Sequence, residues 1–198
     1  MKEIVVATSN KGKIAEIVLA LAKLPVSVLD LSDFANIPEA IENGDSFTAN
    51  ARIKAEHYVK YTGKACLADD SGLEVDVLEG APGIYSARFA GEDADDAANN
   101  QKLIRKLTGV PPERRTARFR CVLVFVDIDG STVIADGVKE GVIGQEMRGS
   151  GGFGYDSLFY MPEMSKTMAE CSKTEKNEIS HRGQALEIMT RKLEEYFK

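Results

Sequence analysis

Three carboxylates in the first half of the sequence could do chemistry together. Asp69 and Asp70 are adjacent in the segment Ala68-Asp69-Asp70-Ser71-Gly72, which follows a short apolar run, and Glu42 lies in an earlier polar loop. Adjacent carboxylates repel, and this repulsion is relieved when a hard cation binds them or when one keeps its proton. A turn that only bends the chain uses the same residue types. These residues therefore indicate either a cation site or a structural turn.

A second polar segment, Thr8 to Lys13, joins an expected strand to an expected helix. Free amides and the positive dipole end at the start of a helix attract anions. The segment adds two lysines and a glycine, which suit phosphate oxygens, but its spacing is not that of a Walker A loop. An ordinary helix cap by Ser9 or Asn10 accounts for the same residues, so this segment alone does not decide between the two interpretations.

The glycine-rich segment from Gly149 to Gly154 formally matches GxGxxG. A dinucleotide-binding loop of this type opens a helix, whereas Tyr155 to Tyr160 has the pattern of a strand, so we reject a Rossmann site. The glycines would let the backbone approach a flat ligand, with Phe153 or Tyr155 as a stacking face. The alternative is that both aromatic rings belong to the core.

Lys176, His181 and Arg182 lie at or near the start of the last expected helix. Positive charge there is unfavourable for the helix dipole, so a ligand or an acidic partner would explain it, and a solvated charged face is the alternative. We expect the other histidine, His57, to be structural. No GxSxG motif or local signature of a nucleophilic cysteine is present. Together, the motifs describe a site for Mg²⁺ and a nucleoside polyphosphate.

The elements that must position these groups follow from hydrophobic periodicity and turn residues. A helix that includes residues 14–21 and helices over residues 47–62, 93–107 and a C-terminal stripe ending at Phe197 are expected. Strands are expected at residues 4–7, 26–31, 64–68, 116–127, 132–142 and 155–160. Strands and helices alternate at both ends around a central hairpin. We therefore expect an α/β fold with a mixed sheet, two lobes and a groove between them.

Composition limits the function further. The chain has 198 residues, of which 43% are hydrophobic and 28% charged, and we expect one domain over residues 1–198. A net charge of −6 lacks the basic field of a protein that binds nucleic acid or an acidic membrane surface. Three scattered cysteines support neither a disulfide framework nor a zinc site, and no apolar run is long enough for a signal peptide or a membrane span. We expect a soluble cytoplasmic protein.

Five segments, taken together, resemble the noncanonical purine nucleoside triphosphate pyrophosphatases, the Ham1/RdgB/inosine triphosphatase family. They occur in the family's order and span nearly the whole chain: SNKGK at 9–13, ENGDSFTANARIKA at 42–55, ADDSGLEVDVLEGAPGIYSARFAG at 68–91, GGFGYD at 151–156 and SHRGQAL at 180–186. The resemblance implies a homodimer of elongated, two-lobed α/β subunits, each with a long mixed twisted sheet and a central groove. It also implies hydrolysis of ITP, dITP or XTP to the monophosphate and pyrophosphate.

The resemblance further implies a role for each motif. Asp70 would activate water, and Glu42, Asp70 and Asp69 would hold Mg²⁺. The substrate-binding residues would be Thr8, Ser9, Asn10, Lys11, Gly12 and Lys13 at the triphosphate, Ser71 nearby, Phe153, Gly154, Tyr155 and Asp156 in one wall of the nucleoside pocket, and Lys176, His181 and Arg182 at the base and phosphates.

Two positions depart from the family pattern. Ser157 replaces a proline, and Ile41 replaces an acidic residue next to Glu42. Two other functions compete with the pyrophosphatase assignment. A Maf-like pyrophosphatase of other specificity would not be expected to carry SHRG and GGFGYD. A silent nucleotide-binding protein would not be expected to keep Glu42, Asp69 and Asp70.

Overall fold

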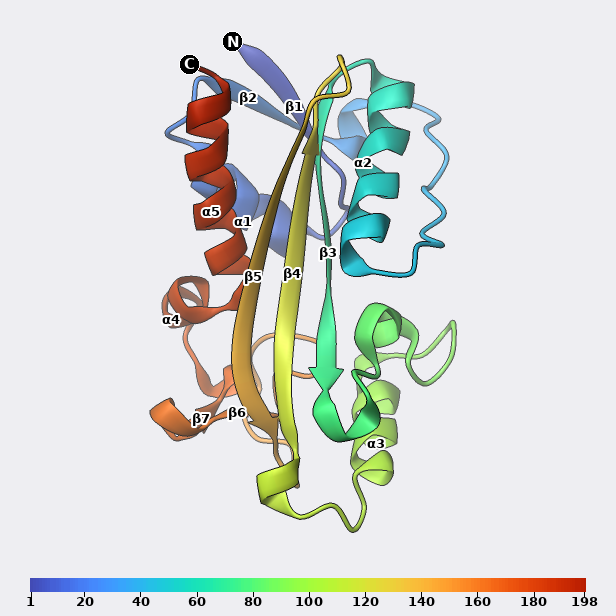
Figure 1. The fold of residues 1–198 in the computed structure, drawn as a ribbon, viewed down its shortest axis with the longest axis vertical. Helices are drawn as coiled ribbons and strands as arrows, with labels where there is room; N and C mark the ends of the chain where they lie inside the picture. Colours follow the sequence, from blue (N-terminus) through green and yellow to red (C-terminus); the bar gives the residue numbers. More distant parts are fainter. The chain divides into compact units, whose positions relative to one another are not determined.

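A computed structural model describes residues 1–198 and has the expected α/β fold. Seven strands form one sheet in the order β2-β1-β3-β4-β5-β6-β7 (Figure 1). The strands are β1 (Lys2–Val6), β2 (Val26–Asp30), β3 (Ala65–Val75), β4 (Thr116–Val126), β5 (Thr132–Ile143), β6 (Phe159–Met161) and β7 (Lys166–Thr167). The helices are α1 (Lys11–Leu21), α2 (Phe47–Thr62), α3 (Asp96–Lys106), α4 (Lys173–Ile179) and α5 (His181–Tyr196).

The sheet is mixed. Strand β1 pairs in parallel with both β2 and β3, whereas β6 pairs antiparallel with β5 and β7. The chain divides into two compact units, and we call residues 1–70, 121–137 and 182–198 the first unit and residues 71–120 and 138–181 the second unit. The mixed α/β fold is thus confirmed. The groove between two lobes stays a prediction.

In the first unit, alternate residues of each strand enter one core. Ile4 and Val6 of β1 and Leu67 of β3 pack with Ile17 of α1 and Met189 of α5. This arrangement follows from the two-residue period of a strand, which sends neighbouring side chains to opposite faces. Figure 1 shows α1 and α5 on one side of these strands and α2 on the other. Adjacent residues of β3 can therefore have entirely different surroundings.

The second unit has its own core. Leu73 of β3 and Phe119 of β4 pack there with Leu103 of α3 and Phe159 of β6. The rings of Phe119 and Phe159 lie 4.5 Å apart. Tyr155, which directly follows the glycine-rich segment, is buried in the same cluster. This core fixes one side of the segment that carries Phe153.

Several predicted boundaries are confirmed. The hydroxyl of Ser46 caps α2 by accepting a hydrogen bond from the amide of Ala49, and Gly63 ends that helix in a left-handed conformation. The residues after β4 form the expected turn, in which the Asp127 amide donates to the Ser131 carbonyl. Favourable capping and turn chemistry explains why these limits were predictable from local sequence.

The two largest errors in the predicted boundaries concern strands. Strand β3 does not end before Asp69 but continues to Val75, so the Asp-Asp-Ser-Gly segment lies inside a strand rather than in a turn. Aspartate is rare within strands, and here ion pairs to Asp69 offset that preference. The strand expected at 155–160 begins only at Phe159, because the amides of Leu158 and Phe159 both donate to the Tyr155 carbonyl in a turn.

The basic cluster before the C-terminus is divided between two helices instead of opening one. Lys176 lies in the short helix α4, whereas His181 and Arg182 begin α5. Ser180 separates the two helices in an extended conformation. None of the helices combines the length and the apolar character needed to cross a membrane.

Candidate functional site

The segment from Thr8 to Lys13 connects the end of β1 to α1 and includes the first residues of that helix. Asn10 is the N-cap of α1, and its side-chain oxygen accepts hydrogen bonds from the amides of Gly12 and Lys13 at 2.9 and 3.2 Å. The capping interpretation is thus correct for these two amides. The side chain of Lys13 extends from α1 toward Asp69 on β3, whereas Lys11 is exposed. A phosphate at this loop would therefore meet lysine side chains rather than those two amides.

Asp69 points to the face of β3 that carries α1 and α5. It is only 2% exposed, and its Oδ2 lies 2.7 Å from Lys13 Nζ and 4.0 Å from Arg182 Nη2. Arg182 also lies 3.4 Å from Glu16 on α1. Burial alone would raise the pKa of Asp69, but Lys13 and Arg182 outweigh it and hold the pKa well below its usual range. Asp69 is therefore a fixed anion that holds two cationic side chains.

Asp70, the next residue, has different surroundings. Its Oδ2 accepts a hydrogen bond of 3.1 Å from the side-chain amide of Asn50 on α2, and the oxygen of the same amide accepts one of 2.8 Å from the Gly44 backbone. A Cβ on Gly44 would lie 2.8 Å from that Asn50 oxygen, so glycine is required for this close approach. Asn50 thus ties the loop that carries Glu42 to the carboxylate of Asp70.

The protonation of Asp70 differs from that of Asp69. Burial raises the pKa of Asp70 to about 6, opposed by the hydrogen bond from Asn50 and the charge of Lys54. The nearby charges of Glu42 and Asp69 act in the same direction as burial, and the value of about 6 is the result of all these effects together. A carboxyl group with such a pKa is mostly ionised at neutral pH and is more basic than an ordinary aspartate.

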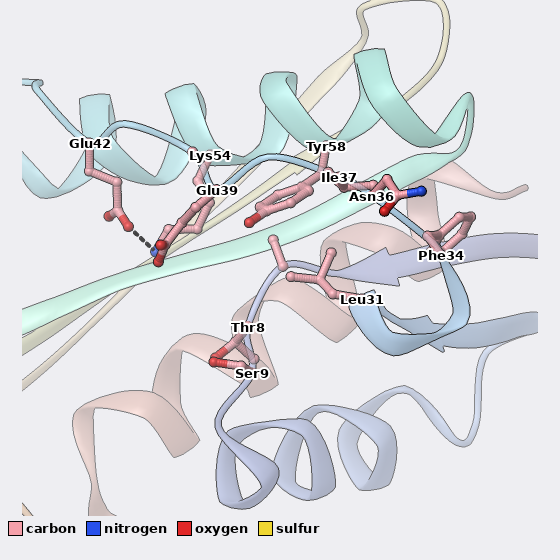
Figure 2. Close-up of a pocket in the computed structure, with 12 residues that line it drawn as sticks. Thr8, Ser9, Leu31, Phe34, Asn36, Ile37, Glu39, Glu42, Lys54 and Tyr58 are labelled. Atoms are coloured by element: carbon pink, nitrogen blue, oxygen red, sulfur yellow. Dashed lines mark ion pairs between the residues drawn. The ribbon is translucent and has the colours of Figure 1, made fainter.

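Lys54 on α2 completes this set. Its Nζ lies 3.0 Å from Glu42 Oε1 (Figure 2). It also donates a 2.8 Å hydrogen bond to the Asp69 backbone carbonyl. Burial opposes the charge on Lys54, yet Asp69 and Glu42 raise its pKa above the ordinary value. Lys54 is therefore a cation held beside the carboxylates of Glu42 and Asp70.

Thr8, Ser9, Glu42 and Lys54 border a cavity of about 430 Å³ within the first unit, whereas Asp69 and Asp70 are not among its lining residues. Figure 2 shows Thr8 and Ser9 on one side and Glu42, Lys54 and Tyr58 on the other. His57, which is half-buried on α2, forms a 2.7 Å hydrogen bond with the Pro38 carbonyl, in agreement with the structural role we expected. The lining residues are Ala7, Thr8, Ser9, Leu31, Phe34, Asn36, Ile37, Glu39, Ala40, Glu42, Lys54 and Tyr58.

In the second unit, a lysine and an aromatic ring stand together. The carboxylate of Asp156, which is 3% exposed, accepts hydrogen bonds from Lys176 Nζ and from the Phe153 amide. The Lys176 ammonium lies 4.7 Å from the centre of the Phe153 ring, and that ring is half exposed. An exposed aromatic face next to a fixed ammonium can bind a flat group that carries hydrogen-bond acceptors.

Two further predicted residues of this region, Tyr155 and His181, are buried and pack in the core of the second unit. The hydroxyl of Tyr155 donates to the Ser86 carbonyl at 2.8 Å, so the ring belongs to the core rather than to an exposed stacking face. The ring of His181 stacks on Phe119 with 4.9 Å between centres. Ser71, which follows Asp70 in β3, is half-buried.

The structure thus brings the predicted residues together in two sets. The first unit holds Thr8 to Lys13, Glu42, Asp69, Asp70 and Arg182, and the second holds Ser71, Phe153 to Asp156, Lys176 and His181. Our residue assignment missed Asn50 and Lys54. A signal was available, because Asn50, Lys54 and Tyr58 recur every four residues and so share one face of α2.

No group of three or more His, Cys, Asp or Glu side chains is placed to hold a metal ion by itself. Glu42 and Asp70 nevertheless offer the hard oxygen donors that Mg²⁺ prefers, and Glu42 contributes to the raised pKa of Asp70. Mg²⁺ commonly binds one or two carboxylates together with substrate phosphates. The donor set fits such an ion. The metal role of Asp69 stays a prediction.

Comparison with known proteins places this arrangement in a family. The family model described as the Ham1 family matches residues 4–192. The chain belongs to the Ham1 family. It is 52% identical over 184 residues to the dITP/XTP pyrophosphatase of Desulforamulus reducens, which covers 93% of this chain and 92% of that protein. It is 49% identical to the dITP/XTP pyrophosphatase of Geobacillus kaustophilus, over 98% of this chain and 96% of that one.

Solved Ham1 structures have the same fold. The HAM1 protein from Coxiella burnetii matches with a TM-score of 0.93 and 43% identity over 98% of this chain and all of that one. The Staphylococcus aureus Ham1 protein matches with a TM-score of 0.91 and 41% identity, over 98% of this chain and all of that one.

The two departures from the family pattern lie at Ile41 and Ser157. Ile41 is 79% exposed, whereas the side chain of Glu42 points toward Lys54. The Ser157 carbonyl accepts a hydrogen bond from the Arg148 amide.

Proposed function

We propose that this protein hydrolyses the noncanonical purine nucleoside triphosphates ITP, dITP and XTP to the monophosphate and pyrophosphate. The observation that carries the proposal is the contrast on β3, where Asp69 is neutralised by cations and Asp70 keeps a raised pKa beside Glu42 and Lys54. Relatives with the name dITP/XTP pyrophosphatase cover nearly the whole chain. Removal of such nucleotides would cleanse the nucleotide pool.

The triphosphate would lie against the cations of the first unit. Lys13 and Lys54 are held by carboxylates, so neither loses much conformational freedom when it meets a phosphate. Thr8 to Lys11 would border the same phosphates. Pyrophosphate leaves with more charge than it had in the substrate, and fixed cations stabilise that charge in the transition state.

Asp70 would act as the general base. Its carboxylate accepts a proton from a water molecule while the water oxygen bonds to the α-phosphorus, and the bond from that phosphorus to the bridging oxygen breaks. Asn50 orients the carboxylate during this step. Glu42 and Asp70 would hold Mg²⁺, which neutralises phosphate charge when bound. We assign Asp69 instead to the orientation of Lys13 and Arg182.

The purine would stack on Phe153 in the second unit. The Lys176 ammonium beside that ring would donate to the carbonyl at position 6 of hypoxanthine or xanthine. Adenine has an amino group at position 6, so this hydrogen-bond donor would face the Lys176 ammonium, which is also a donor. Tyr155 and His181 would support this pocket from the core, and Ser71 would contact the substrate near Asp70. A homodimer and a cytoplasmic location are further proposals, which rest on the family resemblance.

The test is a panel of ITP, dITP, XTP, GTP and ATP, with Mg²⁺ and with excess EDTA, in which monophosphate and pyrophosphate are measured separately. We expect equal amounts of the two products, loss of turnover in EDTA, and kcat/KM for ATP about 10⁴-fold below that for ITP. Comparable values for ATP and ITP would indicate a general or Maf-like pyrophosphatase. Binding of ITP without any hydrolysis would indicate a silent nucleotide-binding protein.

A further inference from the structure

Two side chains of helix α3 form hydrogen bonds with one residue of the glycine-rich segment, Gly154. The Gly154 amide donates to Asp96 Oδ2 at 2.6 Å, and the Gly154 carbonyl accepts from Asn100 Nδ2 at 2.7 Å. Both backbone polar groups of this residue are thus bound by side chains one helical turn apart. Gly154 has a φ of +60°, a conformation that favours glycine.

The side-chain amide of Asn100 is held in one orientation by its hydrogen bonds. The residue is 3% exposed, and Nδ2 also donates to the Asp96 carbonyl at 2.7 Å. Both partners are carbonyl oxygens, so the opposite orientation of the amide would set oxygen against oxygen. The side-chain oxygen of Asn100 is buried without a hydrogen-bond partner. A buried oxygen left in this way is unfavourable, which indicates that the two bonds made by Nδ2 matter.

Gly154 is joined directly to the part of the segment that presents the ring. The amide of Phe153 donates to Asp156, and Asp156 also holds Lys176 beside the Phe153 ring. A Cβ on Gly152 would lie only 2.0 Å from Asp156 Oδ2, so the segment is closely wrapped around that carboxylate. Movement of Gly154 would therefore change the position of the ring relative to the ammonium.

We propose that Asp96 and Asn100 are positioning residues that hold Gly154 and thereby set the selectivity for 6-oxopurines over adenine. This inference rests on the proposed function, because it takes Phe153 and Lys176 to bind the purine. Discrimination by hydrogen bonding depends on donor placement, and a site that is loose by about 1 Å loses much of it. Neither residue would touch the substrate. Both would act through the peptide of Gly154.

The first experiment compares Asp96→Ala with Asp95→Ala. Asp95 is the N-cap of α3 and, like Asp96, is exposed, but its side chain accepts from the Ala98 amide instead of that of Gly154. We expect Asp96→Ala to lower the ratio of kcat/KM for ITP to that for ATP by about tenfold, mainly through KM for ITP. Asp95→Ala should lower Tm and leave the ratio unchanged. Asp96→Asn, which keeps an oxygen acceptor, should restore most of the ratio.

The second experiment measures the segment directly. The chain has no tryptophan, so Phe153→Trp introduces a single tryptophan, which can be excited selectively over the tyrosines. Without any nucleotide, we expect Asp96→Ala in this background to lower the fluorescence anisotropy of Trp at position 153, and Asp95→Ala to leave it unchanged. Asn100→Asp should lower the anisotropy more than Asp96→Ala does, because it places a carboxylate against the carbonyl oxygens of Asp96 and Gly154. If this variant does not fold, the Asp96→Ala result alone decides.

The outcomes separate two kinds of failure. A wild-type protein that does not prefer ITP to ATP would overturn the proposed function, whereas the anisotropy would still report whether α3 holds the segment. Equal selectivity ratios in Asp96→Ala and Asp95→Ala, in a wild-type background that does prefer ITP, would overturn the positioning role. Unchanged anisotropy in Asp96→Ala would overturn it as well.

Discussion

Asp69 and Asp70 are adjacent in β3, yet the two faces of the strand make them different groups. On the face with α1 and α5, Asp69 is paired with Lys13 and Arg182, and its pKa is lowered. On the face with α2, Asp70 receives an amide hydrogen bond, and burial raises its pKa to about 6. The side-chain alternation of a strand thus separates a carboxylate that organises cations from one that can accept a proton.

The second unit repeats the first of these two arrangements. Asp156 is buried and bonds Lys176, as Asp69 is buried and bonds Lys13. In both pairs, the carboxylate limits the lysine to one position, so the ammonium is ready for a ligand. Asp70 differs from Asp69, because its carboxylate accepts a hydrogen bond from the Asn50 side chain and its pKa is raised rather than lowered. This difference is the basis on which we propose a chemical role for Asp70 and an orienting role for Asp69 and Asp156.

The largest expected effect is on turnover. Asp70→Asn should keep the fold and lower kcat for ITP by about a hundredfold or more at saturating Mg²⁺, because the general base is lost. The exposed carboxylate of Asp45, in the loop before α2, provides a control with the same change of charge. Asp45→Asn should keep kcat. Near-normal turnover in Asp70→Asn would move the catalytic role to another residue.

The raised pKa of Asp70 also predicts the sign of a stability effect in the absence of metal. An unfolded aspartate ionises near pH 4, whereas the folded Asp70 ionises near pH 6. Ionisation therefore destabilises the fold progressively between these values and fully above them. In EDTA, Asp70→Asn should have a higher Tm than the wild type at pH 7.5 and a similar Tm at pH 4.

Asp69→Asn should mainly affect stability. It removes the carboxylate that Lys13 and the buried Arg182 share, although Arg182 keeps its ion pair with Glu16. The loss of one partner from a buried ion pair costs about 3 kcal/mol of unfolding free energy. Because the pKa of Asp69 is lowered in the fold, its contribution is present above pH 4 and is lost as the pH falls further. The gap in Tm between wild type and variant should shrink over that acid range. A constant gap would contradict the ion-pair explanation.

The contrast between the two aspartates was only partly predictable from sequence. Apolar periodicity and caps such as Ser46 located most elements, because these signals are local. Because a turn was expected at Asp69, the sequence did not predict that Asp69 and Asp70 point to opposite faces of a strand. Only the fold brings Lys13 and Arg182 next to Asp69. Asn50 was missed for a related reason: its hydrogen bonds reach six residues back and twenty ahead.

A smaller effect is expected at Lys13. Lys13→Ala should weaken binding of a non-hydrolysable α,β-methylene analogue of ITP by about tenfold and hardly change inosine binding, because a charge-assisted contact to phosphate is lost. Calorimetry of both ligands gives the comparison. Lys11→Ala removes the same charge from an exposed side chain and should weaken the analogue less. Equal weakening of inosine and the analogue would show that Lys13 supports the fold rather than phosphate binding.

The smallest effect is expected at Ile41, which tests whether the Asp70 side of β3 lacks a ligand. Ile41→Glu restores the acidic residue typical of the family, next to Glu42. Residue 41 is 79% exposed, whereas Glu42 is already paired with Lys54. Water screens a charge at such a position, so kcat and the Mg²⁺ concentration for half-maximal turnover should change by less than about threefold. A tenfold lower Mg²⁺ requirement would mean that residue 41 turns inward when metal and substrate bind, and that Glu42 and Asp70 are not the full set of acidic ligands.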